Sequence, residues 1–587
     1  MGSPFSKEAT PLTYTYLGSC LATGFSSTYT STAAASIGIG NDMRKVPSTG
    51  DFTSPIMIVG EAPGSSEEMR MQPFVGSSGM ELTRMLAEAG INRDECFITN
   101  VCKYRPPGND ISKWFLKKTE ARRKHIGEIC GRYPNEQIIE GLQELFDEID
   151  IVKPKVIIAL GDTALWALCG ESGITKWRGS TLLHCDIPVV PTYHPAAILR
   201  MWGWRFIAVN DLRKAAALSR RDPSAGLFPK YDFSIRPSYP DTIRILTELR
   251  QQAEEDTLRL ACDIETRFRH IECFGLAWTK RHALCIPFLT NQTKSRSYWT
   301  VDEETQIVWK LRELLTHPKV QIIGQNWNYD SQYMARDWGF VAWPHLDTML
   351  AHHVAFAGLP KALDFLASLY NEQYTFWKEE GHQDNFHTMD MEQHWVYNCK
   401  DCVNTFEASY HIEETIAAFG LEEPLKFQMA MVRPVLKAML RGVKTDVNRR
   451  AAISQKLIEA MIDRENFLNA VLNRKFNPRS SPQMKQLFYE ELGVKPVLNR
   501  KTKKPTLAKG ALSELRKNCD PLIRPVIDAI IEFRRAGTFN SVATTGIDWD
   551  HRIRCSYNIA GTETYRLASS EDAFGFGTNL QNISSGD

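Results

Sequence analysis

The chain has 587 residues, of which 43% are hydrophobic and 24% charged, and its formal net charge is +1. This length predicts several domains of roughly 150 residues each, and the balanced charge excludes a global basic field as the means of binding nucleic acid. No apolar run is long enough to span a bilayer, no secretory signal is visible, and the 13 cysteines show no disulfide framework. A reducing cytoplasm is therefore expected.

The first part of the chain predicts a flexible leader followed by an open α/β sheet. Residues 1–50 are rich in Ser, Thr, Ala and Gly and lack a regular period. Strands alternating with helices then predict one domain over residues 51–222. The expected strands are short apolar runs at residues 54–60, 96–102, 156–161 and 189–195. A ligand site is expected where these strands end.

Polar and glycine-rich motifs lie at or near these strand ends in a fixed order. They are Gly60-Glu-Ala-Pro-Gly64, Pro73-Phe-Val-Gly76, Thr99-Asn100, Lys103 with Arg105-Pro-Pro107, and His194-Pro-Ala-Ala197. Together they resemble the uracil-DNA glycosylase superfamily, most closely its family-4-like branch, over about residues 50–220. The resemblance implies binding of uracil-containing DNA and removal of the base.

Four residues take roles from this resemblance. Phe74 would stack on a flipped uracil, and Asn100 would read its polar edge. Glu61 would handle the attacking water or the sugar, and His194 would stabilise the departing uracil anion. Each also has an ordinary structural role open to it, as a packed Phe, a turn-capping Asn or a turn-supporting His. A non-catalytic module that binds DNA or uracil is therefore the alternative.

The cysteines depart from the family-4 pattern. Those enzymes hold a four-iron four-sulfur cluster with four Cys, including an N-terminal Cys-x-x-Cys pair. Here only Cys20 precedes the first strand, Tyr104 stands before Arg105-Pro-Pro107, and Cys130 alone could correspond to a ligand. Because such a cluster needs four thiolates, none is expected.

A second domain is predicted over residues 223–420, after a charged Pro- and Gly-containing linker. Leu258 to Cys262 alternate as in a strand, so Asp263 and Glu265 leave the same face. Further along, Asn326 precedes Asp330 by four residues, and Tyr397 precedes Asp401 by one helical turn. These spaced motifs resemble the DEDDy 3′–5′ exonucleases, the proofreading domain of family A DNA polymerases, with its RNase H-like fold.

The resemblance implies a site for two divalent ions, Mg²⁺ or Mn²⁺, about 4 Å apart. Its ligands would be Asp263, Glu265, Asp330 and Asp401. Tyr397 would orient the attacking water, and Asn326 would contact the single-stranded 3′ end. The alternative for the carboxylates is a solvated acidic cluster. His345, His352 and His353 are expected to lie on a helix surface or in packing and not to be ligands, and Cys399 and Cys402 are expected to be two ordinary thiols on a helix.

The remaining sequence is predicted to form a helical polymerase thumb over residues 421–545 and the start of an incomplete palm over residues 546–587. Residues 555–570 and 579–583 resemble the segment that enters the palm of family A polymerases. The resemblance implies contacts of Arg566 with the primer end, and contacts along template or primer from Asn579, Gln581 and Asn582. Tyr565 stands where that family usually has Gly.

The sequence thus predicts the N-terminal portion of a phage-like family A DNA polymerase, acting in the cytoplasm of a bacterial host. The carboxylates for nucleotidyl transfer lie further downstream in that family. Polymerisation would then need a separate C-terminal subunit, or the chain is a truncated product; both interpretations stay open. In a further alternative the chain is mainly a structural subunit for that half.

Overall fold

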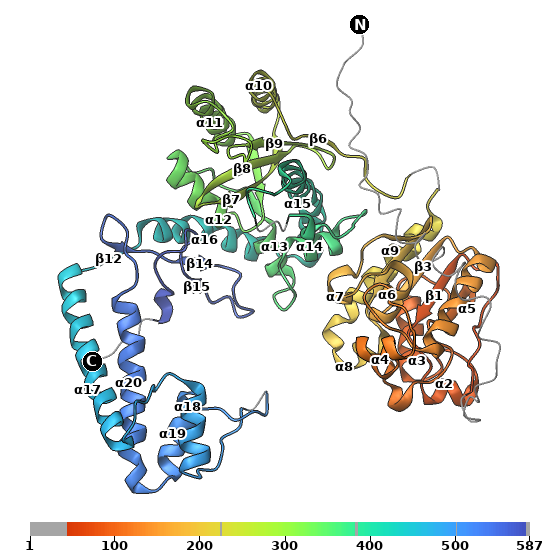
Figure 1. The fold of residues 1–587 in the computed structure, drawn as a ribbon. Helices are drawn as coiled ribbons and strands as arrows, with labels where there is room; N and C mark the ends of the chain where they lie inside the picture. Colours follow the sequence, from red (N-terminus) through yellow and green to blue (C-terminus); the bar gives the residue numbers. More distant parts are fainter. Residues whose placement is uncertain (1–43, 223–225, 382–384, 500–501, 583–587) are drawn as a thin grey trace.

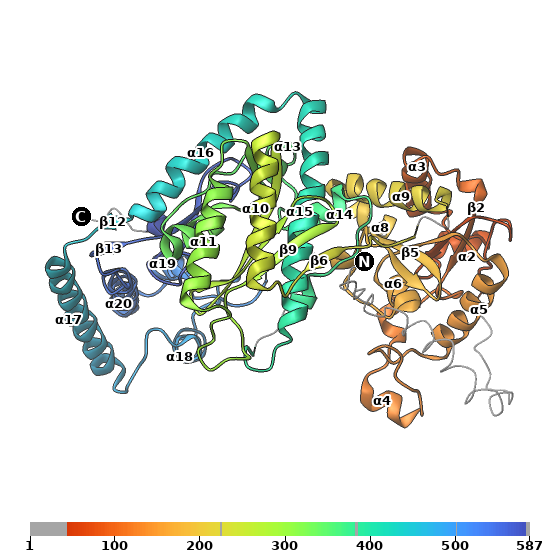
Figure 2. The ribbon, with the colours of Figure 1, turned by 90° about the horizontal axis from the view of Figure 1, so that it is seen from above.

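The computed structural model describes residues 44–222, 226–381, 385–499 and 502–582. Three units follow one another along the chain, and the second lies between the first and the third (Figures 1 and 2). The leader predicted over residues 1–50 falls mostly outside the described residues. The α/β character of the first two units and the helical third unit confirm the predicted fold class.

The first unit is built on a five-stranded sheet in the order β2-β1-β3-β5-β4. Its strands are β1 (Ile56–Gly60), β2 (Cys96–Asn100), β3 (Val156–Leu160), β4 (Leu182–His184) and β5 (Ile187–Thr192). β1 and β3 are buried along their whole length, which explains why each is a continuous apolar run. Only the β4–β5 pair of this sheet is antiparallel among the described strands. The carboxyl ends of the other strands therefore meet at one edge.

Helices cover both faces of this sheet. They are α2 (Ser65–Arg70), α3 (Ser77–Glu88), α4 (Lys118–Arg123), α5 (Glu136–Val152), α6 (Asp162–Cys169), α7 (Ile174–Trp177), α8 (Pro195–Arg200) and α9 (Arg205–Arg220). Met57 and Val59 of β1 pack in one hydrophobic cluster with α5 and α6. Ile56 and Ile58 pack in the opposite cluster with α3 and α9. Successive side chains of a strand point to opposite faces, so β1 contributes to the hydrophobic core on each side of the sheet.

The second unit contains a six-stranded mixed sheet in the order β11-β10-β7-β8-β9-β6. Its strands are β6 (Asp232–Ser234), β7 (Leu258–Arg267), β8 (His270–Ala277), β9 (His282–Pro287), β10 (Val320–Gly324) and β11 (Leu346–Asp347). β7, β8 and β9 form an antiparallel meander. β10 runs parallel to β7 and adds the strand that leads toward Asp330.

Helices also cover both faces of the second sheet. They are α10 (Tyr239–Glu255), α11 (Val301–Leu315), α12 (Asn328–Tyr333), α13 (Thr348–Ala355), α14 (Leu363–Tyr370) and α15 (Met391–Phe419). α10 and α11 pack with Leu260 and Cys262 of β7. α15 packs on the other face with Ala261 and Cys273. Its length places Tyr397 and Asp401 directly across from β7.

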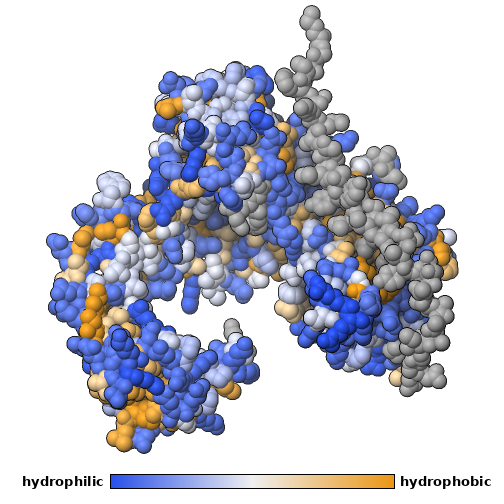
Figure 3. Space-filling model, in the orientation of Figure 1, coloured by the Kyte–Doolittle hydropathy of each residue, from blue (hydrophilic) through white to orange (hydrophobic). Residues whose placement is uncertain are grey.

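The third unit is largely helical. Its elements are α16 (Glu422–Arg441), α17 (Val447–Leu472), α18 (Ser481–Lys485), α19 (Lys509–Asn518), α20 (Arg524–Ala543), β12 (Val443–Lys444), β13 (Arg552–Ile553), β14 (Ser556–Asn558) and β15 (Ala568–Ser570). α17 and α20 lie side by side as a long pair (Figure 1). α17 leaves Ile453, Ile458, Ile462 and Val471 exposed, and hydrophobic residues show along this part of the surface in Figure 3.

The first and second units share a hydrophobic core. Leu363 and Ala367 of α14, together with Tyr374, Phe376 and Trp377 beyond it, join the cluster formed by α5, α6 and the first sheet. The sequence predicted a boundary at residue 222 and gave no sign of this contact. The segment after α14 therefore belongs by sequence to the second unit and by packing to both.

A buried ion pair beside this shared core joins the two units. Arg178 Nε donates to Asp211 Oδ2 at 3.0 Å, and Nη1 donates to Ser368 Oγ of the second unit at 2.8 Å. Replacing Arg178 by Met is expected to destabilise the full chain by about 3–5 kcal/mol, because a buried carboxylate loses its cation. Urea-induced unfolding followed by tryptophan fluorescence measures the change.

The matched control is Arg236→Met, which removes a pair with Glu392 whose side chains are 55% and 50% exposed. That loss should be at most about 1 kcal/mol, because solvent screens exposed charges. Equal effects of the two substitutions would contradict a stabilising role for the buried pair.

Candidate active sites

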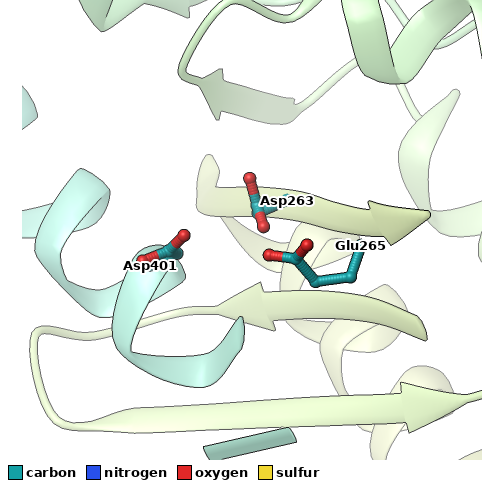
Figure 4. A group of neighbouring side chains, drawn as sticks. All are labelled: Asp263, Glu265 and Asp401. Atoms are coloured by element: carbon teal, nitrogen blue, oxygen red, sulfur yellow. The ribbon is translucent and has the colours of Figure 1, made fainter. Parts of the chain in front are cut away.

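Three carboxylates from two elements of the second unit converge (Figure 4). Asp263 and Glu265 leave the same face of β7, as the strand period requires, and Asp401 faces them from α15. One oxygen from each residue lies within 4.8 Å of the other two. This geometry suits a cation held by oxygen ligands.

Burial and repulsion between neighbouring carboxylates disfavour the ionised forms of Asp263 and Glu265. Loss of solvent, followed by the charge of Asp401, raises the pKa of Asp263 to about 8. For Glu265, loss of solvent and then the charges of Asp263 and Asp401 hold the pKa well above its usual range. A divalent cation between the side chains would reverse this trend, because it favours the ionised form.

Asp330, the fourth predicted ligand, lies beside this group but is not a member of it. It is buried on α12, and its Oδ1 accepts a hydrogen bond from the backbone N–H of Ile264, between the two β7 carboxylates, at 3.0 Å. Loss of solvent and the charge of Asp263 raise the pKa of Asp330. The structure therefore brings three predicted ligands together and places the fourth next to them.

Several side chains hold this group in place. Asn398 Nδ2 donates to Asp263 Oδ2 at 2.9 Å. Trp377 Nε1 donates to Asp401 Oδ1 at 2.6 Å, and Lys378 Nζ donates to Asp401 Oδ2 at 2.5 Å. The sequence did not identify Trp377 or Lys378, because they lie some twenty residues before Asp401 in a segment with no periodic pattern.

Tyr397 lies one turn before Asp401 on α15, as predicted. Its hydroxyl accepts a hydrogen bond from Lys378 Nζ at 2.9 Å. Burial and the charge of Asp401 raise the pKa of Tyr397, so the phenol keeps its proton. Asn326 precedes α12 with a left-handed φ of 59°, and its backbone N–H donates to Asp347 Oδ1 at 3.2 Å.

In the first unit, Phe74, Asn100 and His194 gather at the carboxyl edge of the sheet. The rings of Phe74 and His194 lie 5.8 Å apart between centroids. A Cβ on Gly60 would lie 2.4 Å from Asn100 Oδ1 and 2.5 Å from Phe74 Cζ. Residue 60 must therefore be glycine for these side chains to approach each other at the end of β1.

His194 has a defined tautomer in this arrangement. The backbone N–H of Ala196 donates to His194 Nδ1 at 3.2 Å, so the proton of the neutral ring is on Nε2. Burial, with a smaller effect of Arg200, lowers the pKa of His194 to about 4. The ring is therefore a neutral hydrogen-bond donor through Nε2 at neutral pH.

Glu61 follows β1 directly. Its Oε2 accepts a hydrogen bond from Thr163 Oγ1 at 2.6 Å. Burial raises the pKa of Glu61, and the Thr163 hydrogen bond opposes that shift. Thr163 is the second residue of α6, which follows β3, and the sequence offered no signal for it because a single Thr after a buried strand is common.

The predicted polymerase contacts lie around β15. Asn579 Nδ2 donates to Ser569 O at 2.7 Å, and Gln581 Nε2 donates to Leu567 O at 2.8 Å. These two residues thus fasten their own segment to β15, while Arg566 and Asn582 are exposed. Tyr565 has a left-handed φ of 60°, the conformation that glycine adopts most easily, which explains why glycine is usual there.

Of the residues expected to be surface or packing residues and not ligands, His352, His353, Cys399 and Cys402 are buried, whereas His345, just before β11, is exposed. His352 Nδ1 lies 2.9 Å from Tyr370 Oη, and the ring of His353 lies 4.6 Å from that of Tyr565. Cys399 and Cys402 are buried free thiols on α15.

Cys20 falls outside the described residues, so the expectation of no iron–sulfur cluster stays a prediction. Among the helices that the structure describes, none is both long enough and apolar enough to cross a membrane.

Three family descriptions match successive parts of the chain. "Uracil DNA glycosylase superfamily" matches residues 47–215, "3'-5' exonuclease" matches residues 240–417, and "DNA polymerase family A" matches residues 447–587. The matches follow the order of the three units.

Individual relatives agree with these matches. The type-4 uracil-DNA glycosylase of Sulfurisphaera tokodaii is 38% identical over 185 residues, which cover 30% of this chain and 74% of that protein. The Thermotoga maritima type-4 enzyme is 34% identical over 187 residues, which cover 31% and 86%. The DNA polymerase of Bacillus phage SP01 is 22% identical over 612 residues, and the chain spans 62% of its length.

Among solved structures, the POL domain of Pol1 from M. smegmatis, in complex with DNA primer-template and dNTP, is similar with a TM-score of 0.44 and 17% identity. That match covers 60% of this chain and 56% of the other. The chain belongs to the type-4 branch of the uracil-DNA glycosylase superfamily through its first unit, and it joins that domain to a 3′–5′ exonuclease domain and a family A DNA polymerase domain.

Proposed function

We propose that the second unit removes nucleotides from the 3′ end of single-stranded DNA with two Mg²⁺ or Mn²⁺ ions. The observation that carries this proposal is the group of Asp263, Glu265 and Asp401, of which Asp401 is buried and the other two are partly exposed, and whose oxygens lie within 4.8 Å of one another. Such oxygen ligands fit hard divalent ions. Asp330 would complete the set after releasing the Ile264 N–H. Bound ions would activate water and stabilise the departing 3′ oxygen.

The surrounding residues orient the reaction. Tyr397 is protonated and held by Lys378, so its hydroxyl can position the attacking water beside Asp401. Asn326 lies at the entrance to α12 and would contact the 3′ nucleotide. The alternative, a solvated acidic cluster, is disfavoured because Asp401 is buried, Asp263 and Glu265 are only partly exposed, and Asp263 and Asp401 accept hydrogen bonds from Asn398 and Trp377.

Chelation should separate the two activities of the chain. EDTA is expected to stop 3′ digestion and to leave uracil release unchanged, because the described residues of the first unit gather no metal-binding group near His194. Shortening of a 5′-labelled oligonucleotide and release of labelled uracil measure the two rates. Added Mg²⁺ or Mn²⁺ should restore digestion, whereas digestion that persists in EDTA would contradict the metal site.

We also propose that the first unit excises uracil from DNA. A flipped base would stack on Phe74, and Asn100 would hydrogen-bond its polar edge. As the bond between the sugar and the base breaks, His194 Nε2–H would donate to the uracil anion, and Glu61 would accept a hydrogen bond from the water that adds to the sugar. The neutral His194 tautomer supports this assignment.

Other parts of the earlier predictions remain proposals. These are the domain limits at residues 51–222, 223–420, 421–545 and 546–587, the DNA contacts of Arg566, Asn579, Gln581 and Asn582, a separate C-terminal polymerase subunit, and a location in the host cytoplasm. Primer extension by the chain, alone and with a polypeptide that carries the rest of the palm, tests the polymerase role. A purely structural subunit would show neither nuclease activity nor uracil release.

A further inference from the structure

An interdomain strap, residues 374–381, runs from the shared core of the first two units to the carboxylate site. It follows α14 and includes the short helix Lys378–Gly381. Its first residues are anchored in the first unit, and its last residues touch Tyr397 and Asp401. The strap is thus a direct physical connection between the glycosylase domain and the exonuclease site.

The anchored end of the strap is held mainly by the backbone. Thr181 N–H donates to Tyr374 O at 2.7 Å, and Thr375 Oγ1 donates to Thr181 O at 3.0 Å. Phe376 N–H donates to the hydroxyl oxygen of Ser180 at 3.2 Å, and Ser180 is fully buried. Unlike a surface loop, this end has its polar groups satisfied by another domain.

The other end of the strap enters the exonuclease site. Lys378 Nζ donates to Asp401 Oδ2 at 2.5 Å and to the Tyr397 hydroxyl at 2.9 Å. A Cβ on Gly381 would lie 2.8 Å from the Tyr397 ring, so the strap packs closely on that side chain. Between the two ends, Lys176 of the first unit forms an ion pair with Glu379 of the strap at 2.5 Å.

We propose that Lys378 is a positioning residue of the exonuclease site and that the glycosylase domain holds it there. Its ammonium group fixes one carboxylate oxygen of Asp401 and the hydroxyl of Tyr397 at the same time. One side chain thereby fixes the orientation of Asp401, which would bind metal, and of Tyr397, which would position the attacking water. The inference rests on the proposed exonuclease function and adds to it a residue and a dependence on the first unit.

Lys378→Met in the full chain tests the first part. With Mn²⁺ and a 5′-labelled single-stranded oligonucleotide, kcat is expected to fall about 10–100-fold, the usual cost of losing a residue that orients a metal ligand. KM for the oligonucleotide should change less than about threefold, because Lys378 acts through Asp401 and Tyr397. Lys310→Met, which removes a partly exposed lysine paired with Glu313 far from the carboxylates, is the matched control.

Lys378→Arg separates positioning from packing. It keeps a positive donor, so it should recover at least about tenfold of the kcat lost in Lys378→Met. Two results would overturn the role of Lys378: a kcat in Lys378→Met within about threefold of the unaltered chain, or equal losses with Met and Arg. If the unaltered chain does not digest the oligonucleotide, the exonuclease function itself fails.

Ser180→Ala tests the dependence on the first unit, because it removes the acceptor of the Phe376 N–H without touching the second unit's carboxylates. It should lower exonuclease kcat at least about threefold by displacing the strap. In the Lys378→Met background the same substitution should have less than about a twofold effect, since it acts through Lys378. Full activity in Ser180→Ala, or additive losses in the double variant, would overturn this dependence.

Discussion

Replacing Asp263 by alanine is expected to lower the rate of 3′ digestion at least about 10³-fold. Asp263 offers an oxygen within 4.8 Å of those of Glu265 and Asp401, so its loss removes a ligand that the proposed metal site needs. Metal ions stabilise transition-state charge by several kcal/mol, and each 1.4 kcal/mol is about tenfold in rate. Single-turnover digestion of a labelled single strand with Mg²⁺ measures the loss.

The fold should survive this substitution. In the metal-free chain burial, followed by the charge of Asp401, raises the pKa of Asp263, so alanine removes an unfavourably placed carboxylate while losing the hydrogen bond from Asn398. The thermal unfolding midpoint in EDTA should therefore not fall by more than a few degrees. Asp232→Ala, which removes a carboxylate that is 82% exposed on a strand of the same sheet, is the control. Undiminished digestion by Asp263→Ala would contradict the site.

Replacing His194 by alanine is expected to lower uracil release about 10²–10³-fold, the usual cost of one hydrogen-bond donor to a developing anion. His194 has its Nδ1 occupied by the Ala196 N–H, so Nε2–H is the donor. Its pKa of about 4 lies two units below pH 6, so the ring is neutral at both pH 6 and pH 8. The factor lost on substitution should therefore be the same at these two pH values.

A pH-dependent factor would instead indicate that a charged imidazolium acts on the base. The non-catalytic alternative for the first unit makes a different prediction: no uracil release by the unaltered chain, but tighter binding of uracil-containing DNA than of the matched thymine strand. Measuring release and binding on the same two oligonucleotides distinguishes these outcomes.

Much of the fold could be predicted from local patterns. β1 and β3 are buried apolar runs, and the alternation in Leu258–Arg267 fixes the face of Asp263 and Glu265. The contact of the strap with the first unit could not be predicted, because it depends on the backbone of Thr181 and the hydroxyl of Ser180, neither of which belongs to a sequence pattern.

Some residues of the candidate sites could also be predicted from the sequence, and others could not. Spacing placed Tyr397 and Asp401 on one face of α15, and motif order brought Phe74, Asn100 and His194 to one sheet edge. Lys378, Trp377 and Thr163 were missed, since each acts through a tertiary contact with a residue distant in sequence. The hydrogen bond of Asp330 to Ile264 likewise follows from packing between α12 and β7, not from spacing.

We propose that one chain carries two chemically independent active sites, a metal-dependent exonuclease and a metal-independent uracil glycosylase. The most direct test uses one oligonucleotide with a labelled internal uracil and a labelled 5′ end, treated with the unaltered chain, Asp263→Ala and His194→Ala. We expect Asp263→Ala to release uracil without shortening the strand, and His194→Ala to shorten it with almost no free uracil. Loss of both activities in either variant, or of neither, would contradict two separate sites.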